Sequence, residues 1–309
     1  MSISLLLQFA ICSLVATGAI YVIINTLTRM GIKNQQIPLF WISIILGFIM
    51  AFPNVILTFL NIAKVTPPIH LSMVFSYLTI SLFFFIPLLT MLRPFSFSLS
   101  AARLEVPLLF SICVVYFLYG VDGQPFSLKK IIPLIVIFLI FCYDIMRMLE
   151  LGDYKLETKV KESKAKNFLT LIGFSLIFAI PDLAHVLNID AFAVKTSYTF
   201  FEILLLLSAI FLMLLPHICI VVTWLKNNAP SELLISSIMF CYIFTATLLI
   251  PLIGLYIPMS CSEDLIFYSF TSIIGLGILW FQITVLHHAS RIIATILLAS
   301  FLFLLYSSF

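Results

Sequence analysis

Charged side chains are scarce in this chain. Only 9% of its 309 residues are Asp, Glu, Lys or Arg, whereas 63% are hydrophobic. A soluble domain of ordinary composition carries roughly 25% charged residues. This chain therefore has too little polar surface to cover an apolar core in water. The composition predicts a protein whose solvent, and main partner, is the lipid bilayer.

Motifs of enzymes and of metal centres are also missing. The sequence has no HExxH helix motif, no GxSxG turn and no glycine-rich phosphate loop. Its six cysteines show neither disulfide nor metal-ligand spacing. The net charge of +3 is too small and too dispersed for nucleic acid. We expect a protein that is not an enzyme, needs no cofactor and binds no nucleic acid.

The chain is rich in long apolar runs. A helix needs about 20 apolar residues to cross a hydrocarbon layer of about 30 Å. The sequence therefore predicts an all-α, multi-pass integral membrane protein with about ten transmembrane helices. The first run follows no basic residue, so we interpret it as a span and not as a cleaved signal peptide. The expected spans are 4–27, 37–63, 70–92, 105–120, 130–149, 168–189, 196–225, 232–257, 265–284 and 289–307.

The distribution of Lys and Arg predicts an orientation, because cytoplasmic connections carry an excess of both. One strongly polar linker, 150–167, separates the halves 1–149 and 168–309. Connections after the odd-numbered spans, this linker included, hold 12 of the 16 Lys and Arg residues. The linker is therefore expected in the cytoplasm and both termini on the opposite side. With five spans in each half, the halves are inverted relative to each other.

Prolines recur at equivalent places in the two halves. A shift of 163 residues aligns Pro53 with Pro216, and a shift of 164 aligns Pro87 with Pro251. Pro53 and Pro216 lie inside long apolar runs, where proline removes a helix hydrogen bond and opens a kink. Paired helix breaks in corresponding spans of inverted halves are typical of a transporter's binding site. We therefore expect helix breaks and a site near these two prolines.

The layout resembles the calcium/cation antiporter superfamily, whose best-known members are the sodium/calcium exchangers. The similar stretches are GAIYVIINTLTRMGI (18–32), AFPNVILTFL (51–60), RLEVPLLFSICVVYFLYGVDGQPFSLKKIIPL (103–134) and LLPHICIVVTWL (214–225). The resemblance implies two inverted five-helix repeats and secondary transport of a small inorganic ion. It also implies a Pro-Glu motif on helices 2 and 7.

The chain departs from this family at the implied site. Asn54 and His217 replace the glutamates that should follow the two prolines. On the partner helices, the equivalent positions hold Tyr77 and Ser81 in the first half, and Cys241 and Thr245 in the second. Calcium requires six to eight oxygen ligands, usually with carboxylates among them. The resemblance therefore implies a cation antiporter of altered or lost calcium selectivity, and the ion itself is left open.

Ionisable residues inside spans are secondary candidates, because they are costly in a bilayer. Asp182 and His185 lie one turn apart in an expected span, and Glu202 lies near the start of the next one. Two other functions stay open. One is a seven-span, chemoreceptor-like protein, which a count of spans distinguishes. The other is a membrane scaffold that has lost transport, which a flux measurement distinguishes.

Overall fold

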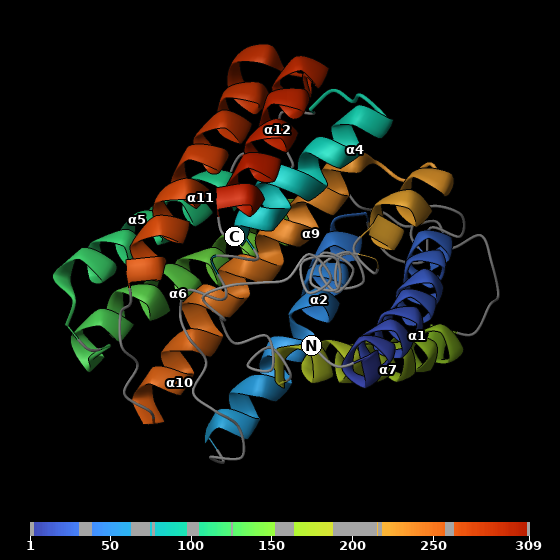
Figure 1. Cartoon of the computed structure of the whole chain (residues 1–309), viewed down its shortest axis with the longest axis horizontal. Helices are drawn as coiled ribbons and strands as arrows, with labels where there is room; N and C mark the ends of the chain where they lie inside the picture. Colours follow the sequence, from blue (N-terminus) through green and yellow to red (C-terminus); the bar gives the residue numbers. More distant parts are fainter. Residues whose placement is uncertain are drawn as a thin grey trace. The chain divides into compact units, whose positions relative to one another are not determined.

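The computed structural model describes residues 3–30, 39–62, 75, 78–97, 105–124, 126–151, 164–187, 215, 218–256 and 263–307. The described secondary structure is almost entirely helical (Figure 1). In lipid, backbone N–H and C=O groups have no water to bond, so a continuous apolar run satisfies them best as a helix. The chain divides into two compact units, Met1–Pro38 with Leu156–Ala229, and Leu39–Lys155 with Pro230–Phe309. Each unit combines segments from both predicted halves.

The first unit is built on α1 (Ile3–Thr28) and α7 (Lys164–Leu187), which pack against each other. A third helical segment, 218–226, packs on α1. Asn227 donates a hydrogen bond to the Asn25 side chain at 2.7 Å, and the Cys219 thiol donates to the Thr17 carbonyl at 3.7 Å. Residue numbers rise together in these two contacts, so α1 and segment 218–226 run in the same direction.

The second unit holds the remaining helices, and most of their ends lie within three residues of the expected ones. The expected span 70–92 is described from residue 78 onward. Three helical rods contain five-residue π-helical segments, which are labelled η. The elements are α2 (Leu39–Ile62), η2 (Ser81–Phe85), α4 (Ile86–Leu92), α5 (Glu105–Asp122), α6 (Leu128–Leu151), α9 (Ser231–Phe244), η4 (Thr245–Leu249), α10 (Ile250–Tyr256), α11 (Glu263–Phe281), η5 (Gln282–Leu286) and α12 (Arg291–Ser307).

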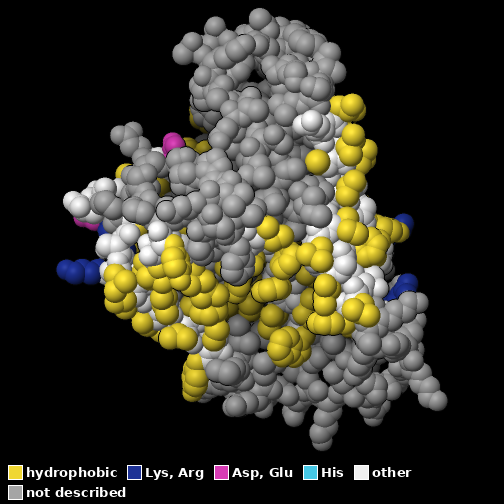
Figure 2. Space-filling view, turned by 90° about the horizontal axis from the view of Figure 1, so that it is seen from below, with side chains coloured by type: hydrophobic (Ala, Val, Ile, Leu, Met, Phe, Trp, Pro, Cys, Tyr) yellow, Lys and Arg dark blue, Asp and Glu magenta, His cyan; other side chains and the backbone are white. Residues whose placement is uncertain are grey.

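Four described helices are long and apolar enough to cross a membrane: Ala10–Thr28, Glu105–Asp122, Leu233–Tyr256 and Asp264–Leu286. Large apolar side chains stay exposed on several helices, among them Ile292 and Phe303 of α12. Figure 2 shows hydrophobic side chains spread across the described part of one face, with Lys and Arg at its margins. Such an apolar exterior is what an integral membrane protein presents to lipid.

Helices α2 and α5 both run in the same direction as the α9–η4 rod. Residue numbers rise together along each of these contacts. Gly47 allows the close approach of α2, because a Cβ there would lie 2.7 Å from the Ser237 carbonyl oxygen. The contacting pairs are Gly47 with Ser237, Asn54 with Thr245, Glu105 with Ser236, and Tyr116 with Ala246.

The other contacts in this unit fix the remaining directions. The η2–α4 rod runs parallel to α11, whereas α11 runs antiparallel to α5, α12 to α4, and α6 to α9. Helices α2, α5, α9 and α12 therefore point one way, and α4, α6 and α11 the other. The pairs are Thr79 with Ser272, Leu82 with Gly275, Phe117 with Phe270, Gly120 with Ile266, Phe84 with Phe301, Met91 with Thr295, Phe138 with Phe244, and Phe141 with Phe240.

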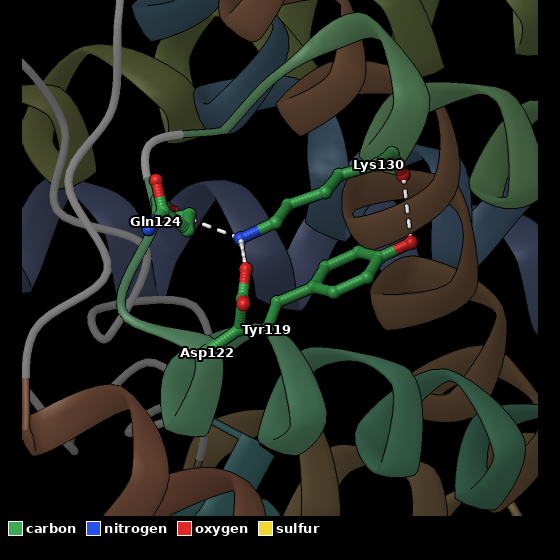
Figure 3. Close-up of polar contacts among 4 residues, drawn as sticks. All are labelled: Tyr119, Asp122, Gln124 and Lys130. Carbon is green, nitrogen blue, oxygen red and sulfur yellow. Dashed lines mark hydrogen bonds and ion pairs between the residues drawn. The ribbon is translucent and has the colours of Figure 1, made fainter.

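The turn between α5 and α6 is held by the ammonium group of Lys130 (Figure 3). Its Nζ lies 2.7 Å from Asp122 Oδ2, donates to the Gln124 carbonyl at 2.9 Å and lies 5.3 Å from the centre of the Tyr119 ring. Gly123 makes the turn with a φ of +63°, a conformation that favours glycine. Asp122 and Gly123 thus form the turn within the stretch 103–134 that resembles the family.

Segments η2 and η4 have the same local structure at positions 164 residues apart. Each begins after an α-helical turn and spans five residues. The N–H of the residue that follows donates to the carbonyl five residues earlier. These bonds run from Ile86 to Ser81 and from Ile250 to Thr245. A proline follows directly in both, Pro87 and Pro251. Proline has no N–H and clashes with the carbonyl four residues before it. The wider π turn makes room for the ring.

Pro251 leaves the Ala246 carbonyl without a partner in its own helix. The N–H of Ile250 is used by Thr245, and the next residue has no N–H. The Tyr116 hydroxyl of α5 donates to this carbonyl at 2.7 Å, and the Tyr116 side chain is completely buried. A neighbouring helix therefore satisfies the backbone group that the proline frees.

This arrangement predicts a coupling between Tyr116 and Pro251. Tyr116→Phe should lower the free energy of unfolding by about 1–3 kcal/mol, since it leaves a buried carbonyl unpaired. In a Pro251→Ala background the same change should cost less, because alanine at this position supplies an N–H. Thermal unfolding of the four proteins in detergent measures the difference. Tyr119→Phe is the matched control, since its hydroxyl bonds to the Lys130 carbonyl. Equal losses for Tyr116→Phe in both backgrounds would rule out the coupling.

Candidate functional site

Four of the six predicted site residues are described, and two of them are in contact. Asn54 of α2 donates from Nδ2 to the Thr245 hydroxyl at 3.5 Å, a long hydrogen bond at the limit of the accepted range. Thr245 is buried and is the first residue of η4. The second and eighth expected spans therefore meet at this contact, within one unit.

Ser81 contacts the same α9–η4 rod through a different residue. It is buried, it is the first residue of η2, and its hydroxyl lies 2.9 Å from the hydroxyl of Tyr242. Tyr242 lies three residues before Thr245, and side chains at this spacing are neighbours on a helix surface. Cys241 is buried and lies four residues before Thr245, also on this side. Asn54 and Ser81 thus contact Thr245 and Tyr242 of one rod, which also carries Cys241.

The resulting neutral cluster comprises Asn54, Ser81, Tyr242 and Thr245. It offers an amide and three hydroxyl groups, all uncharged. Within the described residues, no three His, Cys, Asp or Glu side chains come together to hold a metal ion. Any ion bound by these side chains would be coordinated by neutral oxygens.

Several predicted residues cannot be placed relative to this cluster from the described part of the chain. Tyr77, His217, Pro216 and Glu202 lie outside the described residues. Asp182 and His185 lie in α7, and their side chains also lie outside the described part.

Pro53 lies within α2, which is continuous from Leu39 to Ile62. Any break at Pro53 is therefore a kink within one helix and not an interruption of it. Asn54 directly follows Pro53, and its side chain is half-buried.

Sequence reasoning missed three residues that the structure singles out. Tyr242 completes the neutral cluster, Tyr116 bonds the carbonyl at Ala246, and Glu105 is a buried acid in α5. Glu105 could have been identified from the sequence, because an acidic residue at the start of an apolar run is unusual. The two tyrosines gave no signal, because a tyrosine in an apolar run is ordinary packing material until its hydroxyl partner is known.

No protein-family model and no curated protein sequence matches the chain. Solved structures of the sodium-calcium exchanger NCX_Mj are similar over the full length. The form soaked with 2.5 mM Na⁺ and 0.1 mM Sr²⁺ superposes with a TM-score of 0.71 at 12% identity, covering 99% of both chains. The form in zero Na⁺ and Ca²⁺ superposes with a TM-score of 0.67 at 11% identity, covering 100% of both chains.

At this level of identity the likeness concerns the fold. Nearly complete coverage of both chains excludes a match confined to a few helices, and the apolar exterior agrees with a membrane location. The chain is a multi-pass integral membrane protein with the fold of the sodium-calcium exchanger.

Proposed function

We propose that this protein is a secondary cation antiporter, a divergent member of the calcium/cation antiporter superfamily with altered calcium selectivity. The observation that carries the proposal is the neutral cluster. In a chain with the exchanger fold, Asn54 and Ser81 from two rods meet Thr245 and Tyr242 on one side of a third. Three of these four residues stand at positions that the family resemblance implies for the ion site.

The chemistry of the cluster favours a cation of low charge. Amide and hydroxyl oxygens are hard ligands that suit alkali and alkaline-earth ions. Removing a divalent ion from water costs far more than removing a monovalent one, and only nearby negative charge offsets this. Among the described residues the cluster has no acid, so a monovalent cation is the better fit.

The paired π-helical segments support the inverted-repeat organisation. Ser81 and Thr245 stand at equivalent positions of η2 and η4, each followed six residues later by proline. Two segments that share residue pattern, hydrogen bonding and helix type are expected from a repeated unit. A substrate site between repeats is the usual arrangement in transporters of this kind.

The helix directions support ten spans of alternating orientation. In the second unit, the expected even-numbered spans point one way and the odd-numbered spans the other. In the first unit, α1 and segment 218–226, expected as spans 1 and 7, run in parallel. A seven-span receptor is not favoured, because the described residues alone form nine helical rods besides segment 218–226. A scaffold that has lost transport is distinguished by measuring flux.

Orientation is the first test. Single cysteines in the linker, for example Lys159→Cys, should react with an impermeant thiol reagent only from the cytoplasmic side. Cysteines at both termini should react only from the opposite side, because twelve of the sixteen Lys and Arg residues predict this arrangement. Accessibility labelling in intact cells, in a background without the six native cysteines, gives the answer. Termini found on opposite sides of the membrane would contradict the inverted repeat.

Calcium selectivity is the second test. Wild-type protein in vesicles should show little sodium-driven calcium uptake, because the cluster lacks fixed negative charge. Asn54→Glu combined with His217→Glu should raise calcium uptake, since it restores the two acids that the family resemblance implies. Asn54→Gln combined with His217→Gln is the control, with similar side-chain size and no charge.

Robust sodium-driven calcium uptake by the unmodified protein would show that the site is misplaced. Asp182 and Glu202 would then be the first residues to substitute. An increase with the glutamine pair as large as with the glutamate pair would show that charge is not the missing property.

A further inference from the structure

Glu105 is the buried acid among the described residues. Its side chain is 2% exposed, and it begins α5, one of the four helices able to cross a membrane. The carboxyl group shares a hydrogen bond with the Ser236 side chain of α9. Its other oxygen, Oε2, has no hydrogen-bond partner within the described structure. An acid kept at such a position is a candidate for function, because burying its charge is costly.

A second oxygen without a partner lies at the same level. Ser43 of α2 is 1% exposed, and its Oγ bonds to nothing that the structure describes. Buried hydroxyls elsewhere in the second unit, such as those of Ser237 and Thr247, donate to a carbonyl one turn back. Ser43 lies one turn before Gly47, which touches α9 at Ser237. Because α2 and α9 are parallel, Ser43 is level with residues 233–236.

This group of oxygens is separate from the neutral cluster. Ser236 precedes Thr245 by nine residues, which is about 14 Å along a helix. It lies toward the end of α9 that the proposed orientation places at the cytoplasm. Glu105 and Ser236 are therefore in contact, and Ser43 lies at their level on a third helix, all on the cytoplasmic side of the proposed ion site. Buried polar atoms without partners require an explanation, such as a ligand that comes and goes.

The chemistry of these three residues favours a proton as that ligand. An ionised carboxylate in an apolar interior is normally neutralised, by a cation or by protonation. A metal cation needs several oxygens around it, whereas a proton on Oε2 needs a single acceptor. After a rotation of the carboxyl group, the Ser236 hydroxyl that already bonds to it can accept this hydrogen bond. A protonated Glu105 is also neutral, so it can stay buried while the cation site is empty.

We propose that Glu105, hydrogen-bonded to Ser236, is the proton-binding site of this antiporter, so that protons are the ions exchanged for cations. The inference rests on the proposed transport function and names its counter-ion. In each cycle the O–H bond of Glu105 breaks and the proton leaves to water as one monovalent cation binds. The reverse occurs on the other side, so the two loaded forms carry the same net charge.

The other charged groups of the neighbouring helices lie far from Glu105 or have side chains outside the described ones. Within Leu39–Ile62 of α2 there is no titratable residue. The described charged side chains of α5, α6 and α11 lie near the opposite end of α5, about 26 Å away along a helix of this length: Asp122, Lys129, Lys130 and Asp264. Four charged residues are closer to Glu105 in sequence or in helix register, and the structure does not describe their side chains: Arg103, Asp144, Arg147 and Glu232.

The test uses full-length protein in vesicles with a trapped pH-sensitive dye. An inward gradient of sodium or potassium should raise the internal pH of wild-type vesicles, because each entering cation expels a proton. Glu105→Gln should reduce this rise to the level of protein-free vesicles, because the glutamine side chain carries no exchangeable carboxyl proton. Glu232→Gln and Asp144→Asn, matched losses of an acid nearby, should keep the rise.

A second comparison keeps the acid and changes only its partner. Ser236→Ala removes a hydrogen bond to Glu105 and should shift the pH at which cation-driven proton release is half-maximal. Ser237→Ala removes a hydroxyl that bonds within its own helix and should not shift it. This comparison tests whether Glu105 binds the proton even if the Glu105→Gln variant does not fold.

Three results would overturn the inference. Cation exchange by the wild type without any pH change would leave the proposed function intact and would show that protons are not the exchanged ions. A pH rise that persists in Glu105→Gln, or an unshifted Ser236→Ala, would move the proton site to another residue. Absence of any cation exchange by the wild type would overturn the proposed function and this inference together.

Discussion

Each polar group of a membrane protein needs a partner inside the protein, because lipid offers none. Proline makes this requirement acute, since it frees a carbonyl in the helix that contains it. At Pro251 the chain widens to a π turn and uses the Tyr116 hydroxyl of a neighbouring helix for the Ala246 carbonyl. The same π segment begins at Thr245, where Asn54 makes its contact. The irregular backbone and the neutral cluster are therefore two consequences of one constraint.

That constraint also separates structural hydroxyls from functional candidates. Most serines and threonines in the described helices return a hydrogen bond to their own backbone and need no other role. Ser43, Ser269 and Glu105 Oε2 are exceptions, and Ser43 and Glu105 lie at one level along α9. We propose that the neutral cluster binds a cation and that the acid nearby carries the exchanged proton. Such a division of labour suits a chain whose cation site has no carboxylate.

The helices were predictable from sequence because continuous apolar runs have few alternatives in a bilayer. Positions of Asn54, Ser81 and Thr245 were predictable too, because the proline spacing and the family resemblance located them. Contacts between helices were not, since periodicity carries little information when nearly every residue is apolar. Tyr242 and Tyr116 acquire a role only through partners 161 and 130 residues away. Glu105 was visible as an acid, but its burial against Ser236 depends on which face of α5 meets α9.

The central claim is that a cluster of neutral oxygens in an exchanger fold binds and exchanges a cation. Trans-stimulated uptake of an alkali cation tracer into vesicles tests it most directly. Unlabelled sodium or potassium inside the vesicles should accelerate tracer entry through the wild type. Asn54→Leu combined with Thr245→Val should abolish the acceleration, because it removes two of the oxygen ligands. Wild-type vesicles that show no acceleration with any alkali cation, or a variant that exchanges as fast as the wild type, would contradict this claim.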